Sequence, residues 1–165
     1  KDKADLAKAM LLRYLAHDRQ VLDELFARGD ELNEDPLHGF LVGLRLFAEM
    51  MGNLPEAHPG CLAASFCYQD QLFNSEIREL NAAGLLAWRK RFRERFEEIA
   101  ARYPPRQEID LDALADMAAT LVEGSLILGR APHFLERAAR VHAEAIAGVR
   151  EPDAVVRLGL QMLFE

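Results

Sequence analysis

The feature that most constrains the fold of this chain is the helical spacing of its apolar residues. Near the N-terminus the series runs through Leu6, Met10, Tyr14, Val21 and Leu25. Residues that recur at intervals of three or four share one face of an α-helix. The alternation of apolar and polar residues that would indicate a β-strand is not sustained anywhere in the sequence. We therefore expect an all-α fold.

Glycine, proline and capping residues divide the sequence into six or seven expected helices. Gly29 ends the first helix, Pro36 opens the second, and Asp110 or Asp112 opens the fifth. The expected helices cover about residues 3–28, 37–52, 60–70, 75–103, 110–128, 133–149 and 153–164. A chain of 165 residues has the length of one domain, so residues 1–165 are expected to form a single-domain helical bundle.

The charge of the chain argues against direct binding of nucleic acid, because its formal net charge is −7. One basic segment, "WRKRFRERF" at residues 88–96, goes against this trend. Its aromatic residues lie four apart on one helical face, and its basic residues lie on the others. The preferred interpretation is a solvated face that forms ion pairs with Glu94, Glu97 and Glu98. A surface that contacts phosphate is the alternative.

Targeting features are not recognised in the sequence. No apolar run reaches the roughly 18–20 residues that span a bilayer. The opening "KDKADLAKAM" is charged and does not have the pattern of a signal peptide. Two cysteines in a chain of this length indicate a reducing compartment, so we expect a cytoplasmic protein without a membrane segment.

Motifs that would indicate an enzyme are missing. The sequence has no Glu-x-x-His, no His-Glu-x-x-His, no glycine-rich phosphate loop and no Gly-x-Ser-x-Gly. Cys61 and Cys67 are six residues apart, which separates them by about 120° around a helix axis. We therefore expect neither a shared metal nor a disulfide, and we expect both cysteines to be packing residues. The alternative for Cys61 is a reactive thiol whose pKa is lowered by the helix dipole.

The order of three segments resembles the TetR family of bacterial transcription regulators. These segments are "KDKADLAKAML" at the N-terminus, "GCL" at 60–62 and "VEGSLILGRA" at 122–131. The resemblance covers nearly the whole chain, and Lys1, Lys3 and Leu6 match the start of the family's regulatory domain. Two departures from the family are evident: the helix-turn-helix is missing, and residues 152–164 look like an additional helix.

The resemblance implies a TetR-like C-terminal domain that binds ligand and dimerises, without catalytic activity, metal or cofactor. The first five helices would enclose a mostly apolar effector, and the last two family helices would form a homodimer. Effector binding would shift the position of the first helix and of the DNA-binding domains, as expected of a repressor. DNA would be contacted only through the N-terminal domain that is absent here.

Candidate site residues follow from the apolar stripes and from this resemblance. The predicted ligand-binding residues are Tyr14, His17, Leu44, Phe47, Met51, Cys61, Ser65, Tyr68, Trp88, Phe92, Met117 and Leu121. The predicted dimer residues are Ala118, Val122, Ser125, Leu135, Ala138, Val141, His142 and Ala145. For each pocket candidate the alternative is ordinary core packing. Two other functions stay open: a non-catalytic helical adaptor that binds a different protein, and, less favoured by the missing motifs, an enzyme built on a helical bundle.

Overall fold

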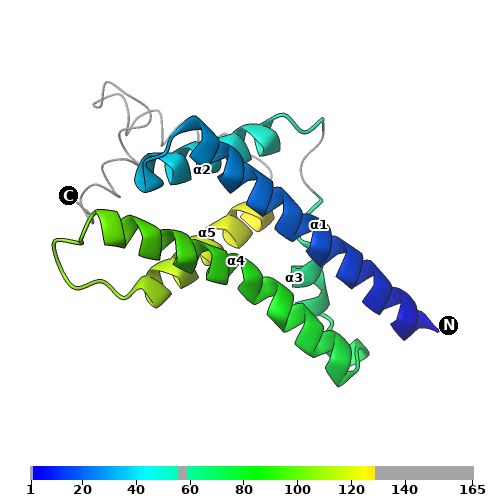
Figure 1. Cartoon of the computed structure of the whole chain (residues 1–165). Coiled ribbons are helices and arrows are strands. Elements are labelled where there is room, and N and C mark those ends of the chain that lie inside the picture. The colour runs from blue at the N-terminus through cyan, green and yellow to red at the C-terminus, as the bar shows by residue number, and fades with distance from the viewer. Residues whose placement is uncertain (1, 56–58, 129–165) are drawn as a thin grey trace.

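The computed structural model describes residues 2–55 and 59–128 of the 165 residues. This part of the chain forms α-helices joined by short loops and contains no β-strand (Figure 1). The helices are α1 (Lys3–Leu32), α2 (Pro36–Gly52), α3 (Leu62–Cys67), α4 (Ser75–Arg102) and α5 (Leu111–Leu128), and a 3-10 turn, η1 (Asp70–Leu72), precedes α4. The predicted all-α class is confirmed. The helices predicted at 133–149 and 153–164 lie outside the described residues.

The starts of the helices follow their capping residues closely. The Asp35 side chain accepts hydrogen bonds from the first turn of α2, and Pro36 is the first residue of that helix. The Asn74 side chain caps α4 in the same way. The Asp110 carboxylate accepts hydrogen bonds from the backbone N–H groups of Asp112 and Ala113, at 2.9 and 3.2 Å. The predicted starts of α2, α4 and α5 are therefore confirmed to within a residue.

The predicted end of α1 at Gly29 is wrong, because α1 continues to Leu32. Gly29 lies where α1 crosses α2, and a β-carbon there would come within 2.3 Å of the carbonyl oxygen of Gly39 and 2.9 Å of the backbone nitrogen of Gly43. The glycine is needed for this close approach of two backbones. Asn33, in an extended conformation, ends the helix instead.

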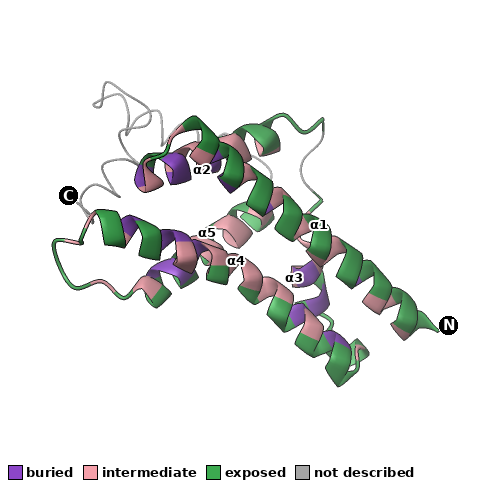
Figure 2. Cartoon of the chain, viewed as in Figure 1, coloured by how far each residue is buried: buried purple, intermediate pink, exposed green. Residues whose placement is uncertain are grey.

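The buried face of α1 also differs from the predicted stripe. Leu6 and Met10 are 62% and 49% exposed, whereas Leu11, Leu22 and Phe26 are almost completely buried. Both series have helical spacing, so periodicity alone does not distinguish them. The face that contacts the other helices is the buried one, and it is rotated by about one residue from the prediction. Figure 2 shows exposed residues along much of α1 and buried residues where the helices meet.

The main core lies where α1, α2, α4 and α5 meet. Its centre is aromatic: the ring centroids of Phe26 and Phe40 are 5.5 Å apart, and those of Phe40 and Phe96 are 5.4 Å apart. The buried members are Leu22, Phe26, Leu37, Phe40, Phe92, Phe96, Ile99, Leu114 and Ala115. The apolar composition of α2 is explained by this position between α1 and α4.

A smaller core holds α3 between the N-terminal half of α1 and the start of α4. Leu11, Phe66 and Ile77 are its buried members, and Phe66 stacks on Phe73 with 4.4 Å between the ring centroids. The helix predicted at 60–70 is shorter than expected, because Gly60 has a positive φ of 100° and the chain turns through η1 after Tyr68.

The basic segment of α4 joins the helices together. Arg95 is 5% exposed and binds both oxygens of Asp30 on α1, and it also binds Glu98. Arg91 pairs with Asp23 on α1 at 3.0 Å. The predicted ion pairs with Glu94, Glu97 and Glu98 are confirmed. The description of this face as solvated is wrong for Arg95, because its side chain reaches inward to the acids of the neighbouring helix.

Candidate ligand cavity

A cavity of about 580 Å³ lies between α1, the start of α3, α4 and α5. Its volume is within the range of small-molecule sites, and its walls are mostly apolar, as such sites require. The lining residues are Tyr14, Leu15, Asp18, Cys61, Ala63, Gly84, Leu85, Leu86, Trp88, Arg89, Asp116, Ala119, Thr120, Val122, Glu123, Gly124, Leu126 and Ile127.

Gly84 on α4 allows α1 and α4 to pack closely in one wall of the cavity. A β-carbon on Gly84 would come within 2.3 Å of Leu15 Cδ2 and 2.5 Å of Leu15 Cδ1. The leucine side chain therefore lies directly on the α4 backbone. This contact fixes how closely the two long helices approach each other beside the cavity.

Tyr14 and Cys61 lie in the same wall of the cavity, and each side chain influences the pKa of the other. Burial, the neighbouring Cys61 and the negative charge of Asp18 raise the pKa of Tyr14 well above its usual value, so the phenol stays neutral at physiological pH. Tyr14 belongs to α1, and Cys61 is the residue that precedes α3.

The thiol of Cys61 does not behave as the helix-dipole interpretation predicts. Burial raises the pKa of Cys61, and the negative charge of Glu123 raises it further; hydrogen bonds from the backbone N–H of Ala64 and from Tyr14 oppose this only in part. The alternative of a reactive thiol with a lowered pKa is wrong, because desolvation of the thiolate outweighs the field of a helix that has only six residues. Cys61 and Cys67 are both free thiols; Cys61 is half-buried, whereas Cys67 is exposed, so the expected packing role is wrong for Cys67.

Trp88 connects the cavity to the main core. Its ring packs against Phe47 and Phe92, with centroid distances of 5.6 and 5.9 Å. Its indole N–H donates to the carboxylate of Asp18 on α1. An aromatic surface and an acidic group are therefore held together at one end of the cavity.

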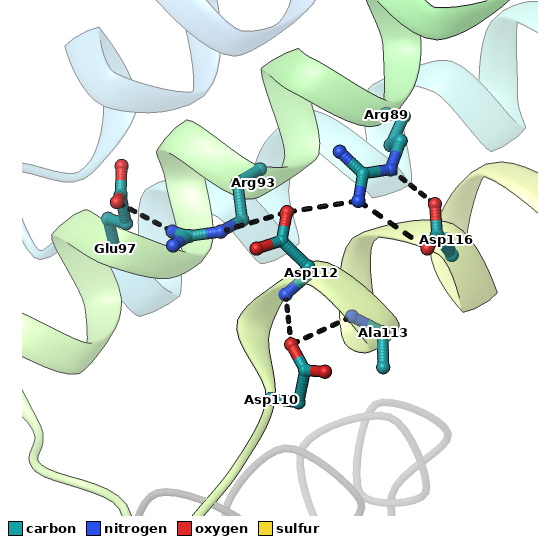
Figure 3. Close-up of polar contacts among 7 residues, drawn as sticks. All are labelled: Arg89, Arg93, Glu97, Asp110, Asp112, Ala113 and Asp116. Carbon is teal, nitrogen blue, oxygen red and sulfur yellow. Dashed lines mark hydrogen bonds and ion pairs between the residues drawn. The ribbon is translucent and has the colours of Figure 1, made fainter.

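A network of ion pairs fixes α5 against α4 at the edge of the cavity (Figure 3). The Arg89 guanidinium binds Asp112 at 2.9 Å and also both oxygens of Asp116. Arg93 pairs with Asp112 at 3.6 Å and with Glu97 at 2.7 Å. The hydrogen bond to Asp116 is the main cause of the raised pKa of Arg89, so this guanidinium stays charged.

The structure brings three of the twelve predicted ligand-binding residues to this cavity: Tyr14, Cys61 and Trp88. Leu44 and Phe92 belong to the main core. Phe47 contacts the Trp88 ring but does not line the cavity, and half-buried Met51 also lies outside the lining. The other five predicted residues, His17, Ser65, Tyr68, Met117 and Leu121, are exposed to solvent.

The structure does not place the two predicted faces of α5 as expected. Met117 and Leu121, predicted for the pocket, are 53% and 64% exposed. Ala118 and Val122, predicted for the dimer, instead pack against the main core, and Val122 lines the cavity. Both faces are apolar, so the spacing did not reveal which one points inward. Ser125 is exposed and donates to the Val122 carbonyl. The remaining predicted dimer residues, Leu135, Ala138, Val141, His142 and Ala145, lie outside the described residues.

The sequence interpretation missed the polar residues of the cavity. Asp18 lies one helical turn after Tyr14, and that spacing could have indicated a shared face. Glu123 is the acidic residue within the apolar run "TLVEGSLIL", and a charge in such a run indicates a functional or paired position. Arg89 was assigned only to the basic segment.

The described residues contain no group of three or more His, Cys, Asp or Glu side chains that could hold a metal ion. In the same part of the chain, no helix is long and apolar enough to cross a membrane. Comparisons with protein-family models, with curated proteins and with solved structures found no match.

Proposed function

We propose that this chain is the regulatory domain of a TetR-like transcription regulator and acts in a repressor. It binds a small effector in the cavity and controls DNA binding by an N-terminal helix-turn-helix domain. The observation that carries the proposal is the cavity itself. Residues from three elements expected to form a pocket, Tyr14, Cys61 and Trp88, meet around a space of about 580 Å³.

The position of α1 supports the proposal that effector binding changes DNA binding. This helix supplies Tyr14 and Asp18 to the cavity and would be the one that continues into a DNA-binding domain. An effector that contacts α1 and α5 together favours one position of α1 over another. Only such a difference in affinity between two arrangements shifts their populations.

The outward face of α5 supports self-association. Met117, Leu121 and Leu128 are all exposed, and their spacing places them along one side of the helix. Exposed apolar residues in a row are typical of interaction surfaces. In this proposal a second copy of the chain covers them through a two-fold interface.

Native mass spectrometry of the purified chain, followed by denaturing mass spectrometry, tests the proposal. We expect the mass of a dimer and release of a small molecule. The variant Ala119→Phe fills the cavity from α5 and should abolish the release, whereas Ala113→Phe, the same change at an exposed position of α5, should not. Release that persists in Ala119→Phe would place the ligand elsewhere.

A non-catalytic helical adaptor is the second candidate function, and the same exposed face of α5 favours it. In that case Met117 and Leu121 would contact a different protein. The native mass of a single chain without a bound small molecule would support the adaptor and would contradict the regulator.

A further inference from the structure

The cavity has more acidic than basic groups. Asp18, Asp116 and Glu123 line it, and Arg89 is the basic residue in the lining. The charge of Arg89 is already satisfied, because its guanidinium binds both Asp112 and Asp116. An anionic effector would therefore meet the Glu123 carboxylate, and the basic residue that the described part of the chain places in the lining is already bound to two acids. This arrangement favours a ligand that carries positive charge.

Glu123 is the group that most requires a partner. Its Oε1 atom is inaccessible to solvent and has no hydrogen-bond partner in the described part of the chain. A carboxylate that has one oxygen removed from water without a partner is costly, and a positive charge beside the part of Glu123 that lines the cavity would offset that cost. Glu123 and Cys61 both line the cavity, and the negative charge of Glu123 raises the pKa of the Cys61 thiol.

The rest of the lining suits the body of a lipophilic cation. Trp88 and Tyr14 offer aromatic surface, and Leu15, Leu85 and Ile127 provide apolar walls. An ammonium group near aromatic faces gains cation–π attraction in addition to its ion pair. The raised pKa of Tyr14 keeps this side chain neutral, so it adds no charge to the cavity.

We propose that the effector is a lipophilic amine, protonated at neutral pH, whose ammonium group binds Glu123 while its apolar body fills the space beside Trp88. This inference rests on the proposed function and specifies the chemical class of its effector.

A matched series of three probes tests the charge preference: 4,4-diphenylbutylamine, 4,4-diphenylbutanol and 4,4-diphenylbutanoate. They share one apolar body and differ in the charge of one end. Trp88 is the single tryptophan of the chain, so its fluorescence reports binding, and calorimetry gives the dissociation constants. We expect the amine to bind at least about tenfold more tightly than the alcohol, and the carboxylate to bind most weakly.

The variant Glu123→Gln identifies the carboxylate responsible. It should remove most of the advantage of the amine and leave the affinity for the alcohol nearly unchanged. Glu79→Gln, at an exposed position of α4 outside the cavity, is the matched control and should change neither affinity.

Three results would overturn the inference: the alcohol or the carboxylate binds as tightly as the amine, the advantage of the amine persists in Glu123→Gln, or none of the three probes binds. The proposed function is decided separately by the molecule released in native mass spectrometry. A released compound that is neutral or anionic would support the proposed effector-binding function and would contradict the proposal that the effector is an amine.

Discussion

The side chain of Asp35 accepts hydrogen bonds from two helices at once. Its Oδ1 atom accepts from the backbone N–H groups of Leu37 and His38 and lies 2.9 Å from His38 Nδ1, while Oδ2 accepts from the Tyr103 hydroxyl at the end of α4. Burial alone would raise the pKa of Asp35. The bonds from Tyr103 and His38 outweigh burial and lower the pKa to about 2.

This lowered pKa predicts how stability depends on pH. A carboxyl whose pKa is lower in the folded chain stabilises the fold above its unfolded pKa, and loses that effect as the pH falls toward the folded value. Asp35→Ala should therefore lower the free energy of unfolding by about 1–2 kcal/mol at pH 7. The difference from the unmodified chain should shrink between about pH 4 and pH 2. Urea unfolding followed by circular dichroism across this range measures it.

Asp35→Asn separates the two contributions of this residue. Asparagine still caps a helix but carries no charge, so this variant should lose less stability than Asp35→Ala at pH 7. A difference that stays constant down to pH 2 in both variants would show that the ionised carboxylate has no special role.

The two cysteines should differ in their reactivity with iodoacetamide. The thiolate is the reacting form, and the raised pKa of the half-buried Cys61 reduces its population at pH 7.5. Cys67 is exposed, so it should be alkylated several-fold faster. Mass spectrometry of the Cys61→Ser and Cys67→Ser variants measures each thiol separately. Equal rates would contradict the burial of Cys61.

At the scale of the element, two glycines in similar helices should respond in opposite directions to the same substitution. Gly29→Ala places a β-carbon 2.3 Å from the backbone oxygen of Gly39 and should destabilise the fold by roughly 3 kcal/mol, the upper end of the cost of overpacking. Gly52→Ala meets no atom within 4 Å and should be neutral or stabilise the fold by up to about 1 kcal/mol. Urea unfolding of both variants measures the contrast.

These glycines also show what could be predicted from the sequence. Helix-start signals act within one turn, so Pro36 and Asp110 mark helix starts that the structure contains. The role of Gly29 depends on Gly39, which lies on the helix packed against it, and local spacing does not include that partner. From a single sequence, a glycine inside a helix cannot be distinguished from a glycine that ends one.

The candidate site was less predictable than the helices, for a related reason. On α5, residues 117 and 121 and residues 118 and 122 form two apolar stripes of equal quality. Which stripe faces inward is decided by contact with α4, where Arg89 binds Asp112 and Asp116 and sets the rotation of α5. That contact joins residues more than twenty positions apart.

At the scale of the whole molecule, the core and the cavity occupy different parts of the helix crossing. The aromatic core of Phe26, Phe40 and Phe96 holds α1, α2 and α4 together, while the cavity lies along α1 toward α3. Trp88, Ala119 and Val122 belong to both regions, because each lines the cavity and packs against the core. A ligand in the cavity therefore contacts α1 and also side chains at the edge of the core.

The last prediction concerns assembly. If a second copy covers the outward face of α5, then Leu121→Asp places a charge in an apolar interface and should reduce the native mass from a dimer to a single chain. Leu121 is 64% exposed in the isolated chain, so the substitution should not destabilise the fold of the single chain itself. Any fall in melting temperature should come only from the loss of the contact between the two copies. Sedimentation velocity measures the mass.

Leu12→Asp is the matched control, because it makes the same change at a position of α1 that is 46% exposed and far from α5 in the sequence. This variant should remain a dimer, since a charge on an uncovered surface costs little. If both variants keep the dimer mass, the contact between copies does not involve Leu121, and the exposed stripe of α5 must be covered by something else. If both become monomers, α1 belongs to the interface as well, and the proposed movement of α1 would then be transmitted directly between the two copies.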